Sequence, residues 1–273
     1  MDFYKINQNG LVLLGCGKMG SAMLQGWLAQ GIKPASVTII DPYPSDWVQS
    51  LMASGVSVNA GLPTSPAVCI LAVKPQMMGE ALPRLQALGN GETLFVSIAA
   101  GTSIASLETI LGKKSPIIRA MPNTPAAVGR GITALIGNAH TNEAQMDMAE
   151  ALLAAVGQTV RLNDEKQMDA VTAVSGSGPA YVFHLIETMA AAGTAQGLPP
   201  ELSMKLAKAT VAGAGELAEQ SNEDPAQLRI NVTSPAGTTA AALEVLMDAN
   251  TGFPKIVGDG IKAAADRSRE LGK

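Results

Sequence analysis

The sequence predicts an α/β fold in two parts: a doubly wound, mainly parallel sheet over residues 1–163, followed by an all-helical domain over residues 164–273. Two observations predict this division. Short apolar runs alternate with helix-like stretches through the first 160 residues, which is the element order of a doubly wound sheet. From Asn163 onward the chain is rich in Ala, Leu and Met, with little of the alternation that marks strands. A length of 273 residues fits two such domains.

Seven segments are predicted to be strands. Each of the first six is a nearly continuous apolar run bounded by Gly, Pro, Asp or Ser, which is typical of strands buried on both faces of a sheet. In chain order the predicted strands are Leu11–Leu14, Val37–Ile40, Val68–Val73, Leu94–Ile98, Pro116–Met121, Ile132–Ile136 and Gln158–Leu162.

Helices are predicted between these strands and throughout the second part. The crossover helices each stop near a glycine, a common C-terminal signal, and they are expected over residues 21–31, 45–55, 81–89 and 106–112. In the second part, helices are expected over Glu165–Val174, Pro179–Gln196, Pro200–Gln220, Thr239–Asp248 and Phe253–Leu271.

Composition excludes several classes of protein. The net charge of -4 and an aromatic content of 3% argue against a nucleic-acid binder, which needs a basic surface or stacking platforms. No apolar run approaches the roughly 20 residues of a membrane span, and the first residues lack a signal-peptide pattern. Cys16 and Cys69 are too few for a disulfide framework and lack metal-ligand spacing. We expect a soluble, cytoplasmic protein with a small-molecule partner and no metal.

A glycine-rich turn, Gly15–Gly20, follows the first predicted strand and opens a helix. Asp41 ends the next strand, 21 residues after Gly20. Together these features predict a Rossmann-type dinucleotide-binding domain, with the pyrophosphate near Gly17 at the start of the helix. A structural glycine turn is the alternative. The residues of this turn that we expect to border the cofactor are Gly15, Cys16, Gly17, Lys18, Met19 and Gly20.

Asp41 favours NADH over NADPH, because its carboxylate suits the ribose hydroxyls and residues 41–47 contain no Arg or Lys for a 2′-phosphate. A turn residue before Pro42 is the alternative for Asp41. Ligands of open α/β sheets lie beyond the carboxyl ends of the strands. Two further strand ends are therefore predicted to border the cofactor, through Ala72, Val73, Lys74, Pro75, Ser97, Ala99 and Ala100.

Three segments carry a more specific signal: RAMPNTP at Arg119–Pro125, SGSGPAY at Ser175–Tyr181, and NVTSPAGTT at Asn231–Thr239. With the glycine-rich turn and Ala72–Pro75, they resemble the pyrroline-5-carboxylate reductase family over essentially the whole chain. The resemblance implies reduction of 1-pyrroline-5-carboxylate to L-proline by NADPH or NADH, the last step of proline biosynthesis. It also implies a helical domain that joins two subunits, often within a larger ring of dimers.

Two predicted helix starts suit a small anionic substrate. Unpaired N–H groups and the positive end of the helix dipole at such a start bind carboxylates. Ordinary helix caps are the alternative for either segment alone. The residues expected at the substrate are Ser175, Gly176 and Ser177 at one start, and Gly237, Thr238 and Thr239 at the other.

The resemblance assigns roles to individual residues. It implies that Thr238 and Thr239 hold the substrate, and that the carboxylate of Glu165 lies close to the substrate pocket. It also implies that Asn59 and Asn231 contact the cofactor, and that Arg119–Pro125 frames the nicotinamide pocket. Family members commonly prefer NADPH, whereas Asp41 favours NADH in this sequence.

Catalysis by positioning is expected. His140 and His184 lie outside every motif, and a protonated cyclic imine is already electrophilic, so hydride attack needs orientation more than an acid. Thr239, with Thr238 beside it, is the predicted catalytic residue, and Tyr181 is the second candidate for a hydrogen bond to the ring nitrogen. A β-hydroxyacid dehydrogenase is one alternative, but residues 176–182 lack its catalytic lysine. A non-catalytic NAD(P)H sensor is the other.

Overall fold

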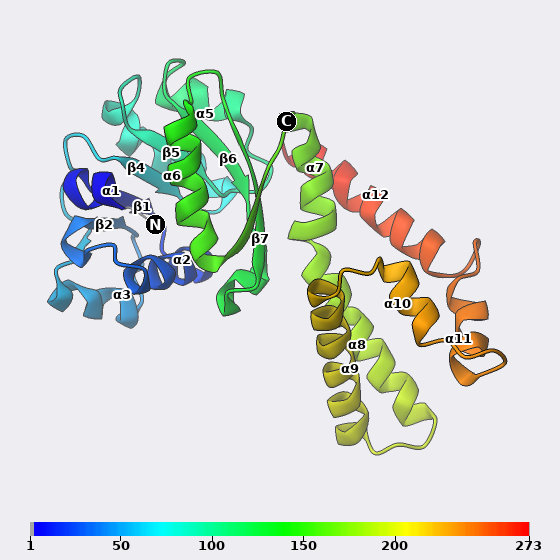
Figure 1. Ribbon diagram of the computed structural model, residues 1–273. Helices are drawn as coiled ribbons and strands as arrows, with labels where there is room; N and C mark the ends of the chain where they lie inside the picture. The colour runs from blue at the N-terminus through cyan, green and yellow to red at the C-terminus, as the bar shows by residue number, and fades with distance from the viewer. Residues whose placement is uncertain (1–2, 273) are drawn as a thin grey trace. The chain divides into compact units, whose positions relative to one another are not determined.

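The computed structural model describes residues 3–272, whose contacts form two compact units. The first unit runs to Gly176 and also includes the chain from Ala265 onward, and the second is Ser177–Ala264. Figure 1 shows the elements of both units. This division describes packing, and the domain boundary predicted after residue 163 stays a prediction.

One sheet forms the centre of the first unit, with strand order β3-β2-β1-β4-β5-β6-β7-β8 among the described residues. Neighbouring strands are parallel except for β6 and β7, which are antiparallel. The strands are β1 (Leu11–Leu14), β2 (Val37–Ile40), β3 (Ser57–Val58), β4 (Val68–Leu71), β5 (Leu94–Ser97), β6 (Ile117–Met121), β7 (Gly131–Gly137) and β8 (Gly157–Arg161). The predicted α/β class and its seven strands are confirmed, and β3 was not predicted.

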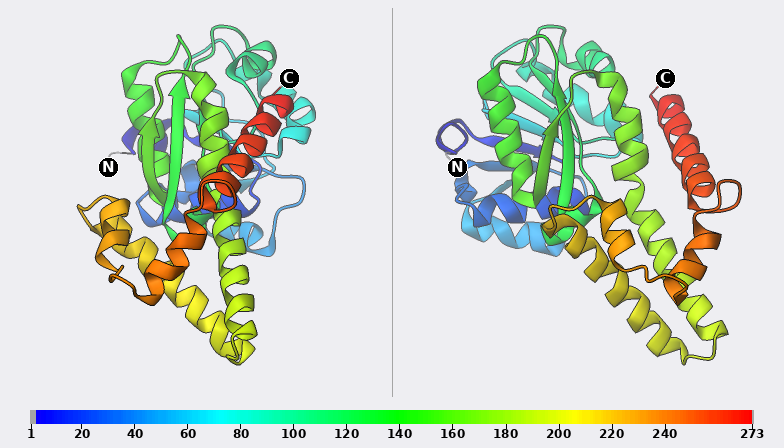
Figure 2. Two further views of the ribbon diagram at one scale, coloured as in Figure 1. Left: turned by 90° about the vertical axis from the view of Figure 1, so that its right-hand side faces the viewer. Right: turned by 45° about the vertical axis from the view of Figure 1, so that its right-hand side comes forward.

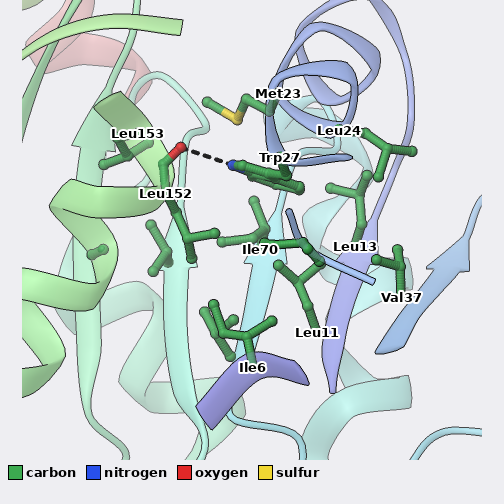
Figure 3. Close-up of a cluster of buried hydrophobic side chains, with 14 of the residues drawn as sticks. Ile6, Leu11, Leu13, Met23, Leu24, Trp27, Val37, Ile70, Leu152 and Leu153 are labelled. Atoms are coloured by element: carbon green, nitrogen blue, oxygen red, sulfur yellow. Dashed lines mark hydrogen bonds between the residues drawn. The ribbon is translucent and has the colours of Figure 1, made fainter. Parts of the chain in front are cut away.

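Helices cover both faces of this sheet (Figure 1). Along β1, Leu11 and Leu13 pack on one face while Val12 and Leu14 pack on the other, so the apolar run is buried on both sides. Figure 3 shows the first of these clusters, where the indole N–H of Trp27 donates to the carbonyl oxygen of Leu152 at 2.8 Å. The helices of this unit are α1 (Tyr4–Asn9), α2 (Lys18–Ala29), α3 (Asp46–Ser50), α4 (Met78–Ala81), α5 (Ile104–Leu111), α6 (Glu143–Leu153) and α7 (Met168–Val171).

Three predicted helices differ in kind from the expectation. The segment predicted over residues 45–55 is α3 followed by a 3-10 helix at Leu51–Ser54. The segment predicted over residues 81–89 is a 3-10 helix at Leu82–Leu88, with Pro83, which has no N–H to donate, in its first turn. The segment predicted over Glu165–Val174 is a 3-10 turn, then α7, then a π-helical turn at Thr172–Gly176. Helices α1 and α6 were not predicted, although Asn142 and Gln145 form a capping box at the start of α6.

The second unit contains helices and no described strand, as predicted. Its helices are α8 (Gly178–Ala195), α9 (Pro200–Gln220), α10 (Pro225–Asn231), α11 (Thr238–Leu246) and most of α12 (Phe253–Leu271). Helix α10 was not predicted. Helices α8 and α9 pack side by side (Figure 2), with Ala190, Ser203 and Ala207 buried. Many large apolar side chains of this unit stay exposed, including Phe183, Leu206, Val245, Phe253 and Ile256. None of the helices in residues 3–272 is long and apolar enough to cross a membrane.

Candidate active site

The carboxyl ends of β1 to β6 lie along one edge of the sheet, because these strands are parallel. The strand order reverses direction between β1 and β4, which is the switch point where open α/β sheets bind ligands. The predicted cofactor residues of the first unit follow these strand ends. The structure therefore brings together Gly15–Gly20, Asp41, Asn59, Ala72–Pro75 and Ser97–Ala100 along this edge.

In the glycine-rich turn, the main chain of Gly15 and Gly20 lies too close to neighbouring atoms to admit a side chain. Gly15 has a φ of +87°, and a Cβ on it would lie 2.9 Å from the Ala72 carbonyl oxygen. A Cβ on Gly20 would lie 2.7 Å from the Gly15 carbonyl oxygen, so the helix packs directly on the turn. By contrast, a Cβ on Gly17 would meet no atom within 4 Å. Gly17 is also the N-cap of α2 and no side chain caps the helix, so this turn offers both open space and N–H donors.

Asp41 is tied to this turn. Its Oδ2 accepts a hydrogen bond from the Cys16 N–H at 2.7 Å, and its Oδ1 accepts one from the Tyr43 N–H at 2.8 Å. The Asn59 side chain bonds both main-chain groups of Asp41, donating to its carbonyl oxygen at 2.8 Å and accepting from its N–H at 3.0 Å. The carboxylate is therefore held at the end of β2 beside the glycine-rich turn.

The Cys16 thiol is buried under the turn. Burial raises its pKa, the nearby Asp41 charge acts in the same direction, and a hydrogen bond with Ser21 partly offsets both. Since its pKa lies above the ordinary thiol value, Cys16 stays protonated at neutral pH and is a poor nucleophile.

A pocket opens beyond the ends of β1, β2 and β4, and sequence reasoning missed part of its wall. It is lined by Leu14, Ile40, Pro42, Val73, Met77, Glu80, Ala81 and Arg84. The part that was missed comes from the short helical turns after Lys74, through Met77, Glu80, Ala81 and Arg84. Lys74 itself is exposed, and its carbonyl oxygen accepts the Met77 N–H at 2.9 Å. The Lys-Pro pair at residues 74–75 was a usable signal, because it starts a helical turn at the end of β4.

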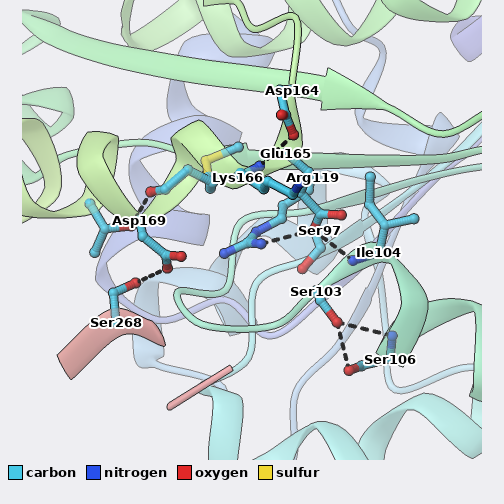
Figure 4. A network of polar contacts seen from close by, with 12 residues as sticks. Ser97, Ser103, Ile104, Ser106, Arg119, Asp164, Glu165, Lys166, Asp169 and Ser268 are labelled. Atoms are coloured by element: carbon cyan, nitrogen blue, oxygen red, sulfur yellow. Dashed lines mark hydrogen bonds and ion pairs between the residues drawn. The ribbon is translucent and has the colours of Figure 1, made fainter. Parts of the chain in front are cut away.

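At the ends of β5 and β6, Glu165 joins two segments (Figure 4). Its Oε1 accepts the Ile104 N–H at 2.9 Å and pairs with an Arg119 guanidinium nitrogen at 2.8 Å. Arg119 is buried at 7% exposure, so it depends on this carboxylate for charge compensation. Sequence reasoning placed Arg119 at the nicotinamide pocket and Glu165 near the substrate, and it missed that the two side chains form a pair.

The first predicted substrate-binding helix start abuts the end of β6. The Asn123 side-chain amide donates to Ser175 Oγ at 3.3 Å, and a Cβ on Gly176 would collide with the Met121 methyl carbon. Ser177, the N-cap of α8, opens the second unit. Ser175 and Gly176 therefore lie beside the Arg119–Pro125 segment, as a shared pocket requires.

The second predicted helix start lies in the second unit. Helix α11 begins at Thr238 after Gly237, and no side chain caps its first turn. Thr239 is half-buried there, and Thr238 is exposed. Asn231, predicted to contact the cofactor, bonds within its own unit to Gln227 at 2.8 Å and Glu223 at 3.0 Å. The contacts to substrate and cofactor expected of these residues stay predictions.

Comparison with known proteins decides the family. Residues 165–271 match the family model for pyrroline-5-carboxylate reductase dimerisation, and residues 11–101 match that for NADP oxidoreductase, coenzyme F420-dependent. The pyrroline-5-carboxylate reductase of Pseudomonas aeruginosa is 42% identical over 264 residues, which cover 96% of both chains. The chain belongs to the pyrroline-5-carboxylate reductase family. The pyrroline-5-carboxylate reductase of Synechocystis is 40% identical, covering 96% of this chain and 98% of the relative.

Solved structures agree with this assignment. A pyrroline-5-carboxylate reductase from Coxiella burnetii superposes with a TM-score of 0.89 at 32% identity, covering 97% of this chain and 99% of that chain. A pyrroline carboxylate reductase from Plasmodium falciparum, with NADP bound, has a TM-score of 0.83 at 30% identity, covering 98% of this chain and 99% of that chain. The predicted family, the two-part fold and the oxidoreductase class are thereby confirmed, together with a nicotinamide cofactor and homo-oligomeric assembly.

Proposed function

We propose that this chain reduces 1-pyrroline-5-carboxylate to L-proline in the cytoplasm, with a reduced nicotinamide dinucleotide as hydride donor. The observation that carries the proposal is the open Gly17 position at the uncapped start of α2, in a chain that matches reductases of this family over almost its whole length. This cradle fits a pyrophosphate, because it combines room with unpaired N–H donors.

The same edge of the sheet supplies the rest of the cofactor site. The pocket walled by Ile40, Pro42 and Val73 offers apolar surface to an adenine ring, with Asn59 and Asp41 beside the ribose. The loop after β5, with Ala99 and Ala100, borders the nicotinamide. When bound, the reduced nicotinamide supplies a hydride with its electron pair.

NADH is the better cofactor in this proposal. The Asp41 carboxylate is held by two main-chain N–H groups, so it cannot turn away from the ribose without losing both bonds. Each carboxylate oxygen keeps a lone pair for a ribose hydroxyl. The positive charge of Arg84, which lines the adenine pocket, acts in the opposite sense by attracting a 2′-phosphate.

The helix starts hold the substrate carboxylate. Main-chain N–H groups at Thr238 and Thr239 donate to it, and the Thr239 hydroxyl hydrogen-bonds the ring nitrogen. Ser175 and Gly176, beside the end of β6, also bind substrate in this proposal, and Glu165 holds the start of α5 and the end of β6 in place.

The reaction then depends on orientation. The imine enters protonated on nitrogen, the hydride forms a C–H bond at the imine carbon, and the C=N π electrons move to nitrogen to give the amine of proline. No residue must donate a proton during this step. The chain's own residues bind, orient and exclude water, which alone provides large rate gains.

A spectrophotometric assay tests the proposal. Protein, NADH and 1-pyrroline-5-carboxylate are mixed, and absorbance of the reduced nicotinamide is followed. We expect loss of absorbance only when the imine is present. Turnover of 3-hydroxyisobutyrate without turnover of the imine would support a β-hydroxyacid dehydrogenase, and NADH binding with no turnover would support a sensor.

A further inference from the structure

The loop after β5 spans residues 98–103. At Ala99 and Ala100, the two residues proposed to border the nicotinamide, the side chain is a methyl group that cannot take part in chemistry. In the proposed function this loop contributes the shape and position of its main chain beside the nicotinamide. Gly101, at its centre, has a φ of +73° and is buried. A loop of small residues around a glycine is free to move unless neighbouring segments hold it.

We propose that the end of α12, residues 265–271, positions this loop for hydride transfer, with Ser268 as a positioning residue that touches neither substrate nor cofactor. The proposal rests on the reductase function proposed above. These residues pack within the first unit, although α12 begins in the second.

One contact joins the end of α12 directly to the loop. A Cβ on Gly101 would lie only 3.2 Å from the Cβ of Leu271, and a Cβ on Gly272 would lie 3.1 Å from the Gly101 carbonyl oxygen. The helix end therefore packs directly on the middle of the loop. No intervening side chain absorbs a shift, so displacement of this turn moves Gly101 or leaves a gap beside it.

A second, indirect link connects the end of α12 to Ile104, the residue that follows the loop. Ser268 is 4% exposed, and its hydroxyl donates to Asp169 Oδ1 at 2.6 Å (Figure 4). Asp169 lies four residues after Glu165, whose carboxylate accepts the N–H of Ile104 at the start of α5. One buried hydroxyl thus joins the helix end to the segment that fixes the end of the loop.

These contacts surround a polar pocket whose walls include Gly101, Arg119, Glu165, Asp169 and Arg269. Arg119 and Glu165 already pair with each other, and the hydroxyl of Ser268 compensates Asp169. The Arg119–Glu165 pair and the Ser268–Asp169 hydrogen bond each hold two chain segments together. Their arrangement therefore favours a positioning role over a second ligand site.

A double-mutant cycle on the Ser268–Asp169 hydrogen bond tests the proposal. Ser268→Ala and Asp169→Ala remove the bond from opposite ends, and the double variant removes both partners. Arg267→Ala is the matched control, because Arg267 lies on the same turn but is exposed and pairs with Glu270 at the surface. Each is assayed for kcat, for the Kd of NADH without substrate, for thermal unfolding, and for the isotope effect on kcat with NADH deuterated at the transferred hydride.

We expect either single variant to lower kcat by about tenfold, since a misplacement of about 1 Å costs up to a hundredfold. The isotope effect should rise, because hydride transfer becomes the slow step, while the Kd of NADH and the control stay as in the wild type. The double variant should be no worse than either single one.

Three results would overturn the positioning role: an unchanged kcat in Ser268→Ala, multiplying losses in the double variant, or a loss of kcat that follows the folded fraction without any rise in the isotope effect. If Asp169→Ala does not fold, Ser268→Ala alone still decides, and Asp169→Asn, which keeps an acceptor oxygen, should restore most of kcat. A wild type with no imine-dependent turnover would refute the proposed function itself.

Discussion

Neutralising Asp41 should shift cofactor preference toward NADPH. The substitution Asp41→Asn removes the charge but keeps one oxygen to accept a main-chain N–H, so the link to either Cys16 or Tyr43 survives. Any loosening of the glycine-rich turn weakens NADH and NADPH alike. The ratio of the two affinities therefore cancels this shared effect, and it reports the lost charge together with any lost hydrogen bond to the ribose of NADH.

The size of the shift follows from Coulomb's law. The 2′-phosphate of NADPH carries nearly two negative charges, and at about 5 Å and an effective dielectric near 20 each unit pair repels by roughly 3 kcal/mol. Asp41 is partly exposed, so solvent and salt reduce the net effect to about 1–2 kcal/mol. This corresponds to a change of about five- to thirtyfold in the NADPH-to-NADH ratio.

Paired measurements of KM and Kd for both cofactors check this prediction, on wild type, Asp41→Asn and Arg84→Ala. The wild type should prefer NADH, Asp41→Asn should lose most of that preference, and Arg84→Ala should strengthen it by weakening NADPH. Equal or better use of NADPH by the wild type, unaltered in Asp41→Asn, would show that Asp41 only shapes the turn.

Three further predictions follow from the site and the second unit. Thr239→Ala should lower kcat/KM for the imine by roughly ten- to a hundredfold, the cost of a hydrogen bond to a charged group, with NADH affinity unchanged; an unchanged kcat/KM would remove Thr239 from the site. Gly17→Ala should weaken cofactor binding by about tenfold without lowering the unfolding temperature. Gly20→Ala, whose Cβ would lie 2.7 Å from the Gly15 carbonyl oxygen, should lower both the cofactor affinity and the unfolding temperature. Identical effects of the two substitutions would contradict the assigned roles. Sedimentation at micromolar concentration should show at least a dimer, in which residues 164–273 form the subunit interface. We also expect a larger ring of such dimers. A fully active monomer would contradict this.

Sequence predicted the strands and the glycine-rich turn because their signals are local. Leu11–Leu14 and Val37–Ile40 are strands with the predicted bounds, since an apolar run buried on both faces is visible in four residues. The turn at Gly15–Gly20 is likewise visible in the sequence, because its glycines stand where the main chain leaves no room for a side chain or must admit a ligand.

The direction of β7 was within reach of the sequence but was not predicted. Only residues 122–130 separate β6 from β7, and parallel neighbours need a crossover connection of about a dozen residues or more. A connection this short therefore favours the antiparallel pairing that the structure shows.

Pairs of distant residues could not be predicted from one sequence. Arg119 and Glu165 are 46 residues apart, and Asp169 and Ser268 are 99 apart. Each residue alone looks like an ordinary surface charge or a helix serine. Only the fold shows that Arg119 and Ser268 are buried and which carboxylates they contact.

Transfer of deuterium tests the central claim most directly. NADH deuterated at the transferred position of the nicotinamide is incubated with the protein and 1-pyrroline-5-carboxylate, and the product is analysed by mass spectrometry and chiral chromatography. Direct hydride transfer predicts L-proline that carries one deuterium on the carbon of the former imine, formed in equal amount to the NADH oxidised. Oxidation of NADH without deuterated L-proline, or no oxidation when the imine is supplied, would contradict the account.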